Sequence, residues 1–296
     1  MKKNTYLIWL EWPEKCFRVN AKDIAAQKAM VPAGSRVIWA KSEAAFLRVL
    51  PSATHALVWN FDAVWFARAK NLRVLATPAA GQELLPKQGP DGVTIHFGGF
   101  HGEAIAETVV GLMLAWCRGV VAAMRSDKVW PRVDLSGTSY RLSGTHAVVL
   151  GYGRIGRTIG TKLEALGVRV TGIRRKNIDD LATAARTADW LIAALPSDTG
   201  TDNLIGPKLI AKLPRRCVVV NIGRGNAIDE VALVKALRTK RLAGALLDVF
   251  KDEPLTAARQ IAGNIPNLVR LPHASAFYPG YIRDCFAELE REGLLK

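Results

Sequence analysis

Short apolar runs alternate with amphipathic stretches along most of the chain. In its first part, four runs rich in β-branched and aromatic residues predict strands. They lie at Tyr6–Leu10, Arg36–Ala40, His55–Trp59 and Leu72–Ala76. Helical periodicity lies between strands in Glu43–Leu50 and Phe61–Lys70. This alternation predicts a parallel sheet with helices on both faces.

The second part of the chain repeats this pattern after a break. The stretch Gly81–Gly102 is rich in glycine and proline and predicts mostly loop, which leads into a long apolar helix near Glu103–Met124. A second loop, Ser126–Gly144, follows, and Tyr281–Gly293 predicts a last amphipathic helix. Six further strands are expected at Ala147–Leu150, Arg169–Ile173, Trp190–Leu195, Val218–Ile222, Gly244–Val249 and Leu268–Leu271. We therefore expect two doubly wound α/β domains.

The composition is consistent with two domains in a reducing compartment. A chain of 296 residues, 49% of them hydrophobic, can bury two separate cores. Its four cysteines form no C-x-x-C pair, so we expect neither a metal site nor a disulfide framework. Free thiols favour a cytoplasmic protein.

Two apolar segments are too short to target the chain or to cross a membrane. The run Tyr6–Leu10 ends at Glu11, which is too early for a signal peptide. The run Ile105–Met124 contains Glu107 and Arg118, with about ten uncharged residues between them, where a membrane span needs roughly twenty. We expect a buried helix there and no membrane partner.

The formal net charge of +15 is high. It is compatible with a solvated basic surface, or with anionic ligands such as a dinucleotide and a carboxylate substrate. Nucleic acid is a weaker candidate and is not expected as a partner, because the basic residues are scattered and no nucleic-acid motif accompanies them.

A dinucleotide-binding motif begins the second domain's sheet. Gly151–Gly156 has the form G-x-G-x-x-G and follows the strand His146–Leu150. It opens the helix Ile155–Leu166, and the strand Val168–Ile173 comes next. This is the strand–helix–strand context that the motif requires. A glycine-rich turn without a ligand is the alternative, and the intact context disfavours it.

Each glycine of the motif has a physical role in binding a dinucleotide. Gly151 permits the tight turn, Gly153 lets the backbone approach the pyrophosphate, and Gly156 allows the helix to pack closely on the strand. The pyrophosphate would then lie on free N–H groups at the positive end of the helix. We expect a Rossmann domain that binds a nicotinamide dinucleotide.

The end of the next strand indicates which dinucleotide binds. An NAD site places an acidic residue there for the ribose hydroxyl, whereas this chain has Arg174, Arg175 and Lys176, with no carboxylate before Asp179. A guanidinium binds a 2′-phosphate through two parallel hydrogen bonds. The turn therefore predicts NADP(H) in preference to NAD(H), although a solvated basic turn is the alternative.

Three later motifs place candidate catalytic residues just beyond strand ends. They are Arg224 within Val220–Gly225, Glu253 within Leu247–Pro254, and His273 after Leu271 and Pro272. In an open α/β sheet the carboxyl ends of the strands form the ligand crevice, so these three side chains can converge.

At these motifs the sequence resembles the D-2-hydroxyacid dehydrogenases. The resemblance runs from about Leu142 to Ala276, and the first hundred residues match in their strand–helix rhythm only. It implies a catalytic Arg224, Glu253 and His273. It also implies a flavodoxin-like substrate domain (1–102 and 277–296) with the Rossmann domain (103–276) inserted into it, and a homodimer. Further cofactor contacts are implied for Arg154, Ile155, Leu195, Pro196, Ile222 and Asp248.

The chemistry suits each residue type. Arg224 can hold a substrate carboxylate in its planar fork and polarise the adjacent ketone. His273 can give a proton to the carbonyl oxygen as hydride arrives. Glu253 can bond the other ring nitrogen, which orients the imidazole and raises its pKa.

The expected substrate is a small 2-oxo acid or 2-hydroxy acid. The substrate loop departs from the family, because Ala79–Glu83 has Glu where Asp is usual, but amides near Ala80 and Gly81 can still bind a carboxylate. Glyoxylate or hydroxypyruvate is favoured, since NADPH use in the family often accompanies that activity. The alternatives are another 2-hydroxy acid, such as phosphoglycerate or D-lactate, and a dinucleotide-sensing protein of the corepressor type.

Overall fold

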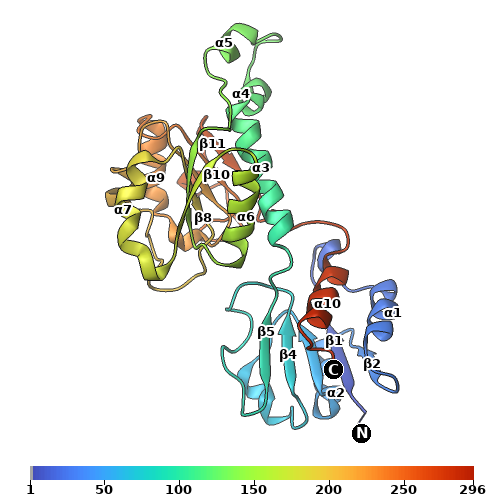
Figure 1. The fold of residues 1–296 in the computed structure, drawn as a ribbon. Helices are drawn as coiled ribbons and strands as arrows, with labels where there is room; N and C mark the ends of the chain where they lie inside the picture. The colour runs from blue at the N-terminus through green and yellow to red at the C-terminus, as the bar shows by residue number, and fades with distance from the viewer. Residues whose placement is uncertain (1–2) are drawn as a thin grey trace. The chain divides into compact units, whose positions relative to one another are not determined.

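The computed structural model describes residues 3–296, and the chain divides into two compact units (Figure 1). Unit 1 comprises the described residues up to His101 together with Phe277–Lys296, and unit 2 comprises Gly102–Ala276. The predicted boundary left Gly102 in the first domain. Gly102 instead begins the helix α3 and belongs to unit 2.

Unit 1 contains a five-stranded parallel sheet in the order β2-β1-β3-β4-β5. This order is that of a flavodoxin-like sheet, as predicted. Its strands are β1 (Thr5–Trp9), β2 (Arg36–Trp39), β3 (His55–Val58), β4 (Val74–Thr77) and β5 (Thr94–Phe97).

The helices of unit 1 come from both parts of the chain that form it. The last helix, α10, packs against α1 and η1, so the C-terminal segment completes the unit that the N-terminal segment begins. The α-helices are α1 (Ala21–Met30), α2 (Glu43–Val49) and α10 (Tyr281–Arg291), and the 3-10 helices are η1 (Lys15–Phe17), η2 (Leu50–Ser52) and η3 (Ala63–Ala67).

Two predictions in unit 1 are wrong in detail. The stretch Gly81–Gly102, predicted as mostly loop, contains the strand β5, which was not predicted, and the predicted helix Phe61–Lys70 is only the short η3. β5 was missed because it lies inside a stretch whose glycines and prolines indicate loop, and these outweigh the few apolar residues of the strand. β5 forms because its backbone pairs with β4, which is distant in sequence.

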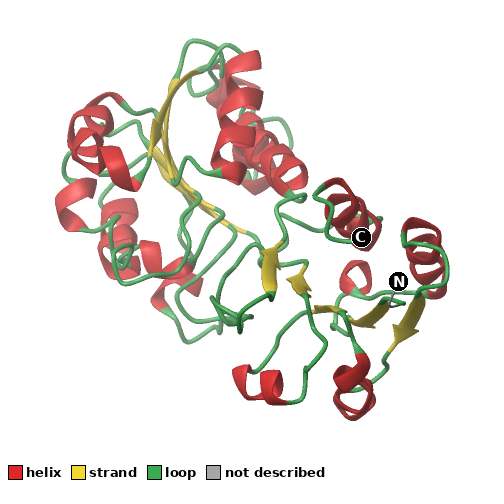
Figure 2. Ribbon diagram, turned by 60° about the horizontal axis from the view of Figure 1, so that its bottom comes forward, coloured by secondary structure: helices red, strands yellow, loops and turns green. Residues whose placement is uncertain are grey.

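Unit 2 contains a six-stranded parallel sheet in the order β11-β10-β9-β8-β6-β7. The chain builds β6 and β7 in one direction and then returns past β6 to add β8, so the carboxyl ends of β6 and β8 flank a switch point. Both faces of the sheet are covered by helices (Figure 2). The strands are β6 (His146–Leu150), β7 (Arg169–Ile173), β8 (Trp190–Ala193), β9 (Val218–Asn221), β10 (Gly244–Leu247) and β11 (Leu268–Arg270).

The predicted long helix Glu103–Met124 is broken. α3 ends at Cys117, and Gly119, at φ 76°, turns the chain into α4. Among the described residues, no helix is long and apolar enough to span a membrane. The α-helices of unit 2 are α3 (Gly102–Cys117), α4 (Val120–Arg125), α5 (Arg132–Ser136), α6 (Arg154–Ala165), α7 (Leu181–Ala184), α8 (Pro207–Ile210) and α9 (Glu230–Arg238), and its 3-10 helices are η4 (Arg175–Asp180), η5 (Ala185–Thr187), η6 (Gly225–Ala227) and η7 (Gln260–Ala262).

Candidate active site

The glycine-rich turn lies at the switch point, between the buried strand β6 and the helix α6. Gly151 has φ 84°, and a Cβ there would clash with the backbone of Ala194. A Cβ on Gly156 would clash with the carbonyl of Gly151, so α6 packs directly on the turn. A Cβ on Gly153 would meet no described atom within 4 Å, which leaves the approach to its backbone open.

The start of α6 can receive an anion. Helical residues begin at Arg154, and none of the described side chains caps the helix at Gly153. The first N–H groups of a helix have no intrahelical partner, and they carry the positive end of the helix dipole. The open face at Gly153 and the positive end of this helix fit a pyrophosphate. Arg154 and Ile155, predicted to contact the cofactor, are the first two residues of this helix.

Tyr152 holds the turn against its neighbours, and sequence reasoning missed this role. Added Cβ atoms on Gly160 of α6 and on Gly172 of β7 would both clash with the Tyr152 ring. The ring therefore occupies the space that these two glycines leave, and it fixes the glycine turn between strand and helix. The glycines lie outside the G-x-G-x-x-G spacing, so the motif gives no sign of them.

The basic turn after β7 lies close to the glycine turn. Arg174 donates from Nε to the carbonyl oxygen of Tyr152 at 2.7 Å. Arg175 is 87% exposed and pairs through Nη2 with Oδ2 of Asp198 at 3.0 Å. Lys176 is exposed beside it.

Asp198 places a carboxylate next to the basic turn, which the sequence interpretation did not anticipate. Residues 174–178 include no acidic residue, but the loop after β8 brings Asp198 to Arg175. Oδ1 of Asp198 accepts the Gly200 N–H at 2.8 Å, so its side chain is fixed from the other side. Leu195 and Pro196 begin the same loop, half-buried and exposed respectively.

The imidazole of His273 and the carboxylate of Glu253 form a close pair. His273 Nδ1 lies 2.7 Å from Glu253 Oε2, and Glu253 Oε1 accepts the Phe250 N–H at 2.8 Å. The His273 side chain is 50% exposed, and Nδ1 is the ring nitrogen that contacts Glu253. Sequence reasoning found the pair but missed the Phe250 amide that orients it.

Each member of the pair shifts the pKa of the other. The hydrogen bond from Glu253 raises the pKa of His273 above its ordinary value, against the opposing effect of burial. Burial disfavours ionised Glu253, but the hydrogen bonds from His273 and from the Phe250 amide outweigh it and lower the pKa of Glu253. The arrangement favours a protonated His273 next to an ionised Glu253. The imidazolium is then a proton donor that the carboxylate holds in place.

Asp248, predicted to contact the cofactor, supports the His273 loop. Its fully buried carboxylate accepts the N–H groups of Ala274 at 2.7 Å and Ser275 at 3.0 Å. Its carbonyl oxygen accepts the His273 N–H at 2.8 Å. His273 has φ 53°, a left-handed conformation that is costly for a residue with a side chain, and these three bonds hold it there.

Arg224 lies at the same edge of the sheet, on the turn after β9. The buried amide of Asn221 accepts the Gly223 N–H at 3.1 Å and donates to the Arg224 carbonyl at 3.0 Å. Arg224 is half-buried, and its charge acts on the pKa values of both Glu253 and His273. Unit 2 therefore brings together the three predicted catalytic residues.

The remaining predicted site residues are Ile222, in unit 2, and Ala80 and Gly81, in unit 1. Ile222 is buried next to Gly223, where the ends of β8 and β9 approach so closely that a Cβ on Gly223 would clash with Leu195. Ala80 is exposed and Gly81 is buried in the loop after β4. These last two residues belong to unit 1 and are not among the residues that unit 2 brings together.

The chain is similar to known proteins over most of its length. A family model for the "D-isomer specific 2-hydroxyacid dehydrogenase, NAD binding domain" matches residues 110–275. A glyoxylate reductase from Thermofilum pendens is 31% identical over 258 residues, which cover 80% of this chain and 75% of that enzyme. A glycerate dehydrogenase from Methylorubrum extorquens is 28% identical over 221 residues, which cover 69% of each chain.

A solved structure of similar fold covers nearly the whole chain. It is an NADPH-dependent glyoxylate/hydroxypyruvate reductase from Sinorhizobium meliloti, in complex with NADP and sulfate. The TM-score is 0.77 at 24% identity, over 99% of this chain and 94% of that one. The match extends to both units, including the first hundred residues.

Proposed function

The chain belongs to the D-isomer specific 2-hydroxyacid dehydrogenase family of oxidoreductases, and we propose that it reduces a small 2-oxo acid to the D-2-hydroxy acid with NADPH. The observation that carries the proposal is the His273–Glu253 pair at 2.7 Å, at the same sheet edge as Arg224 and the glycine turn. In this proposal unit 2 binds the dinucleotide and unit 1 supplies the substrate loop.

When bound, the nicotinamide supplies the hydride that adds to the carbonyl carbon of the substrate. The protonated His273 gives its proton to the carbonyl oxygen, so that C=O becomes CH–OH and the ring becomes neutral imidazole. Glu253 and the Phe250 amide keep the ring in the donating orientation. Arg224 binds the substrate carboxylate and stabilises the negative charge that develops on the oxygen.

The preference for NADPH rests on the basic turn after β7. Arg174, Arg175 and Lys176 would hold the 2′-phosphate, with the pyrophosphate on Gly153 and the start of α6. Asp198 would compete with the phosphate for Arg175. Leu195, Pro196 and Ile222 would line the cofactor, and Asp248 would act through the His273 loop.

The proposed substrate is glyoxylate or hydroxypyruvate, because the names of several relatives include one or both of these acids. In this proposal Arg224 of unit 2 binds the substrate carboxylate, and the amides of Ala80 and Gly81 are the candidate carboxylate donors of unit 1. The protein acts as a homodimer, because α4, α5 and the segment between them expose several large apolar side chains. Four free cysteines are consistent with a cytoplasmic enzyme.

The test is consumption of NADPH, followed optically, with a panel of 2-oxo acids that differ in their side chains. His273→Ala is the control and should lose about 10² to 10⁴ in kcat while NADPH still binds. Binding of NADPH without turnover of any 2-oxo acid would instead support a dinucleotide sensor of the corepressor type. Full activity of His273→Ala would remove the proposed proton donor.

A further inference from the structure

The loop that carries Glu253 is held at both ends by one carboxylate. Glu230, the first residue of α9, accepts the Lys251 N–H on Oε1 at 2.8 Å. Its Oε2 accepts Nη2 of Arg259 at 2.5 Å, and the Glu230 side chain is only 11% exposed. Lys251 and Arg259 bracket residues 252–258, within the irregular segment between β10 and η7, and Glu253 lies between them. Glu230 therefore closes this loop at its base.

A second contact joins the same loop to the turn that carries Arg224. That turn runs through η6 directly into α9, so Arg224 and Glu230 are parts of one short segment. Gly225, next to Arg224, lies against the backbone of Phe250 and Lys251, where any Cβ would clash. The amide of Phe250 is the one that holds Oε1 of Glu253. The two catalytic segments thus pack backbone to backbone, and Glu230 ties them.

We propose that Glu230 is a positioning residue, which with Arg259 fixes the Glu253 loop against the Arg224 turn and thereby sets the contact of Glu253 with His273. This inference rests on the proposed function, in which those three residues act on the substrate. The distance from Glu253 to His273 depends on where the loop lies, because Glu253 reaches the ring from the loop and not from a strand.

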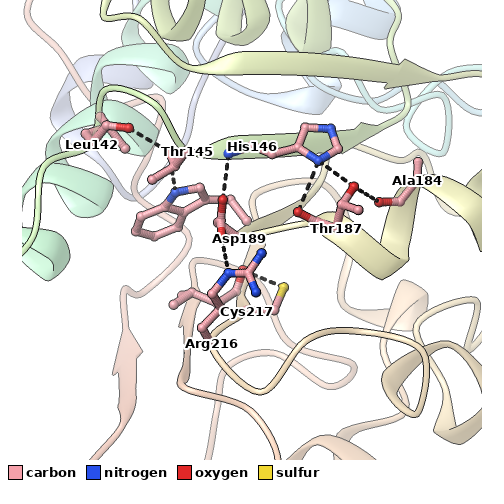
Figure 3. Close-up of polar contacts among 10 residues, drawn as sticks. Leu142, Thr145, His146, Ala184, Thr187, Asp189, Arg216 and Cys217 are labelled. Carbon is pink, nitrogen blue, oxygen red and sulfur yellow. Dashed lines mark hydrogen bonds and ion pairs between the residues drawn. The ribbon is translucent and has the colours of Figure 1, made fainter.

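The chain contains a matched control for this arrangement. Asp189, at the amino end of β8, also joins a backbone amide and an arginine: it accepts the His146 N–H at 2.8 Å and pairs with Arg216 (Figure 3). Asp189 and Glu230 therefore make the same kinds of contact. Asp189 lies at the amino ends of the strands, and Glu230 follows the carboxyl end of β9. Loss of either carboxylate removes a backbone acceptor and an ion pair, but only Glu230 lies beside the catalytic loops.

The experiment compares Glu230→Ala and Arg259→Met with Asp189→Ala and Arg216→Met in the full-length protein. The readouts are kcat, KM for NADPH, the thermal midpoint, and the pKa of His273 from its ring resonances by NMR. The charged groups that act on His273 are Glu253, Asp248 and Arg224, and all are retained in the four variants. A shift in its pKa therefore reports on their placement.

We expect Glu230→Ala to lower kcat by about tenfold to a hundredfold, since a catalytic group misplaced by about 1 Å can cost that much. KM for NADPH should stay unchanged, and the pKa of His273 should fall toward its ordinary value of about 6.5. Arg259→Met should show the same changes to a smaller degree, and it replaces Glu230→Ala as the decisive variant if the latter does not fold. The Asp189 and Arg216 variants should lower the thermal midpoint only.

Equal kcat values for the Glu230 and Asp189 variants, with an unshifted pKa of His273, would overturn the inference and leave Glu230 as a stabilising residue only. Failure of the proposed function is a separate result, namely no turnover of any 2-oxo acid by the wild-type protein. The NMR titration needs no turnover, so it decides the positioning role in either case.

Discussion

At the scale of single residues, the proposed mechanism requires His273 to carry a proton for reduction, so its pKa should set the pH range of activity. The hydrogen bond from Glu253 raises that pKa. For reduction, kcat/KM should therefore be highest below the pKa of His273 and should fall as the pH rises through it, at a pH above about 6.5. Glu253→Gln removes the negative charge and should move the fall to lower pH. Profiles of kcat/KM against pH that coincide for both proteins would exclude this role for Glu253.

Arg224 is expected to bind the substrate carboxylate through two parallel hydrogen bonds. Arg224→Lys keeps the charge but loses the planar fork. Each hydrogen bond to a charged group contributes about 1.5–3 kcal/mol, so kcat/KM for the 2-oxo acid should fall by about tenfold to a hundredfold, and Arg224→Ala should lose more. Steady-state kinetics with saturating NADPH measure this loss. Equal values for Lys and Arg would mean that a point charge is sufficient.

Substitutions of Arg175 and of Asp198 should change the affinity for NADPH in opposite directions. Arg175→Ala should weaken NADPH binding by about tenfold and leave NADH binding nearly unchanged, because only NADPH carries the 2′-phosphate. Asp198→Asn removes the carboxylate that pairs with Arg175 and should strengthen NADPH binding. Both effects should shrink at high salt, since Arg175 is exposed. Fluorescence titrations with both cofactors provide the measurement, and parallel changes for NADPH and NADH would contradict the assignment.

At the scale of elements, α6 and β7 are joined through the Tyr152 ring. A Cβ on Gly172 would clash with that ring, so Gly172→Ala should lower the free energy of unfolding by about 1–3 kcal/mol. In a Tyr152→Ala background the ring is gone, and the same substitution should cost much less. A double-mutant cycle by denaturant unfolding measures the coupling. Additive effects of the two substitutions would show that the ring does not fill this space.

The elements that the sequence predicts are those with a local pattern. The strand β6 and the glycine turn are read from consecutive residues, and Arg224, Glu253 and His273 are found because each follows a strand end. Contacts between loops have no such pattern. Asp198 reaches Arg175, and Glu230 reaches the Glu253 loop, only after the sheet has aligned its carboxyl ends. β5 was missed because the glycines and prolines around it indicate loop, whereas the strand itself forms by pairing with β4.

At the scale of the whole molecule, unit 2 exposes an apolar surface that a monomer would leave in water. Figure 1 shows α4 and α5 beyond the end of α3, away from the sheet of unit 2. This segment exposes Met124 at 82%, Val129 at 100%, Trp130 at 78% and Val133 at 83%. Large exposed apolar groups gathered on one segment mark an interaction site, and the family resemblance implies a second copy of the chain as its partner.

We therefore expect a homodimer in solution, with an interface of upwards of roughly 2,000 Å² if it is obligate. Trp130→Asp with Val129→Asp should convert the dimer to a monomer, because a buried unpaired carboxylate in the interface is costly. Val64→Asp is the control, since Val64 is 70% exposed but lies in unit 1, and this variant should remain dimeric. Light scattering at micromolar concentration distinguishes the states. A wild-type monomer, or dissociation of the Val64 variant as well, would contradict the assignment of this segment as the dimer interface.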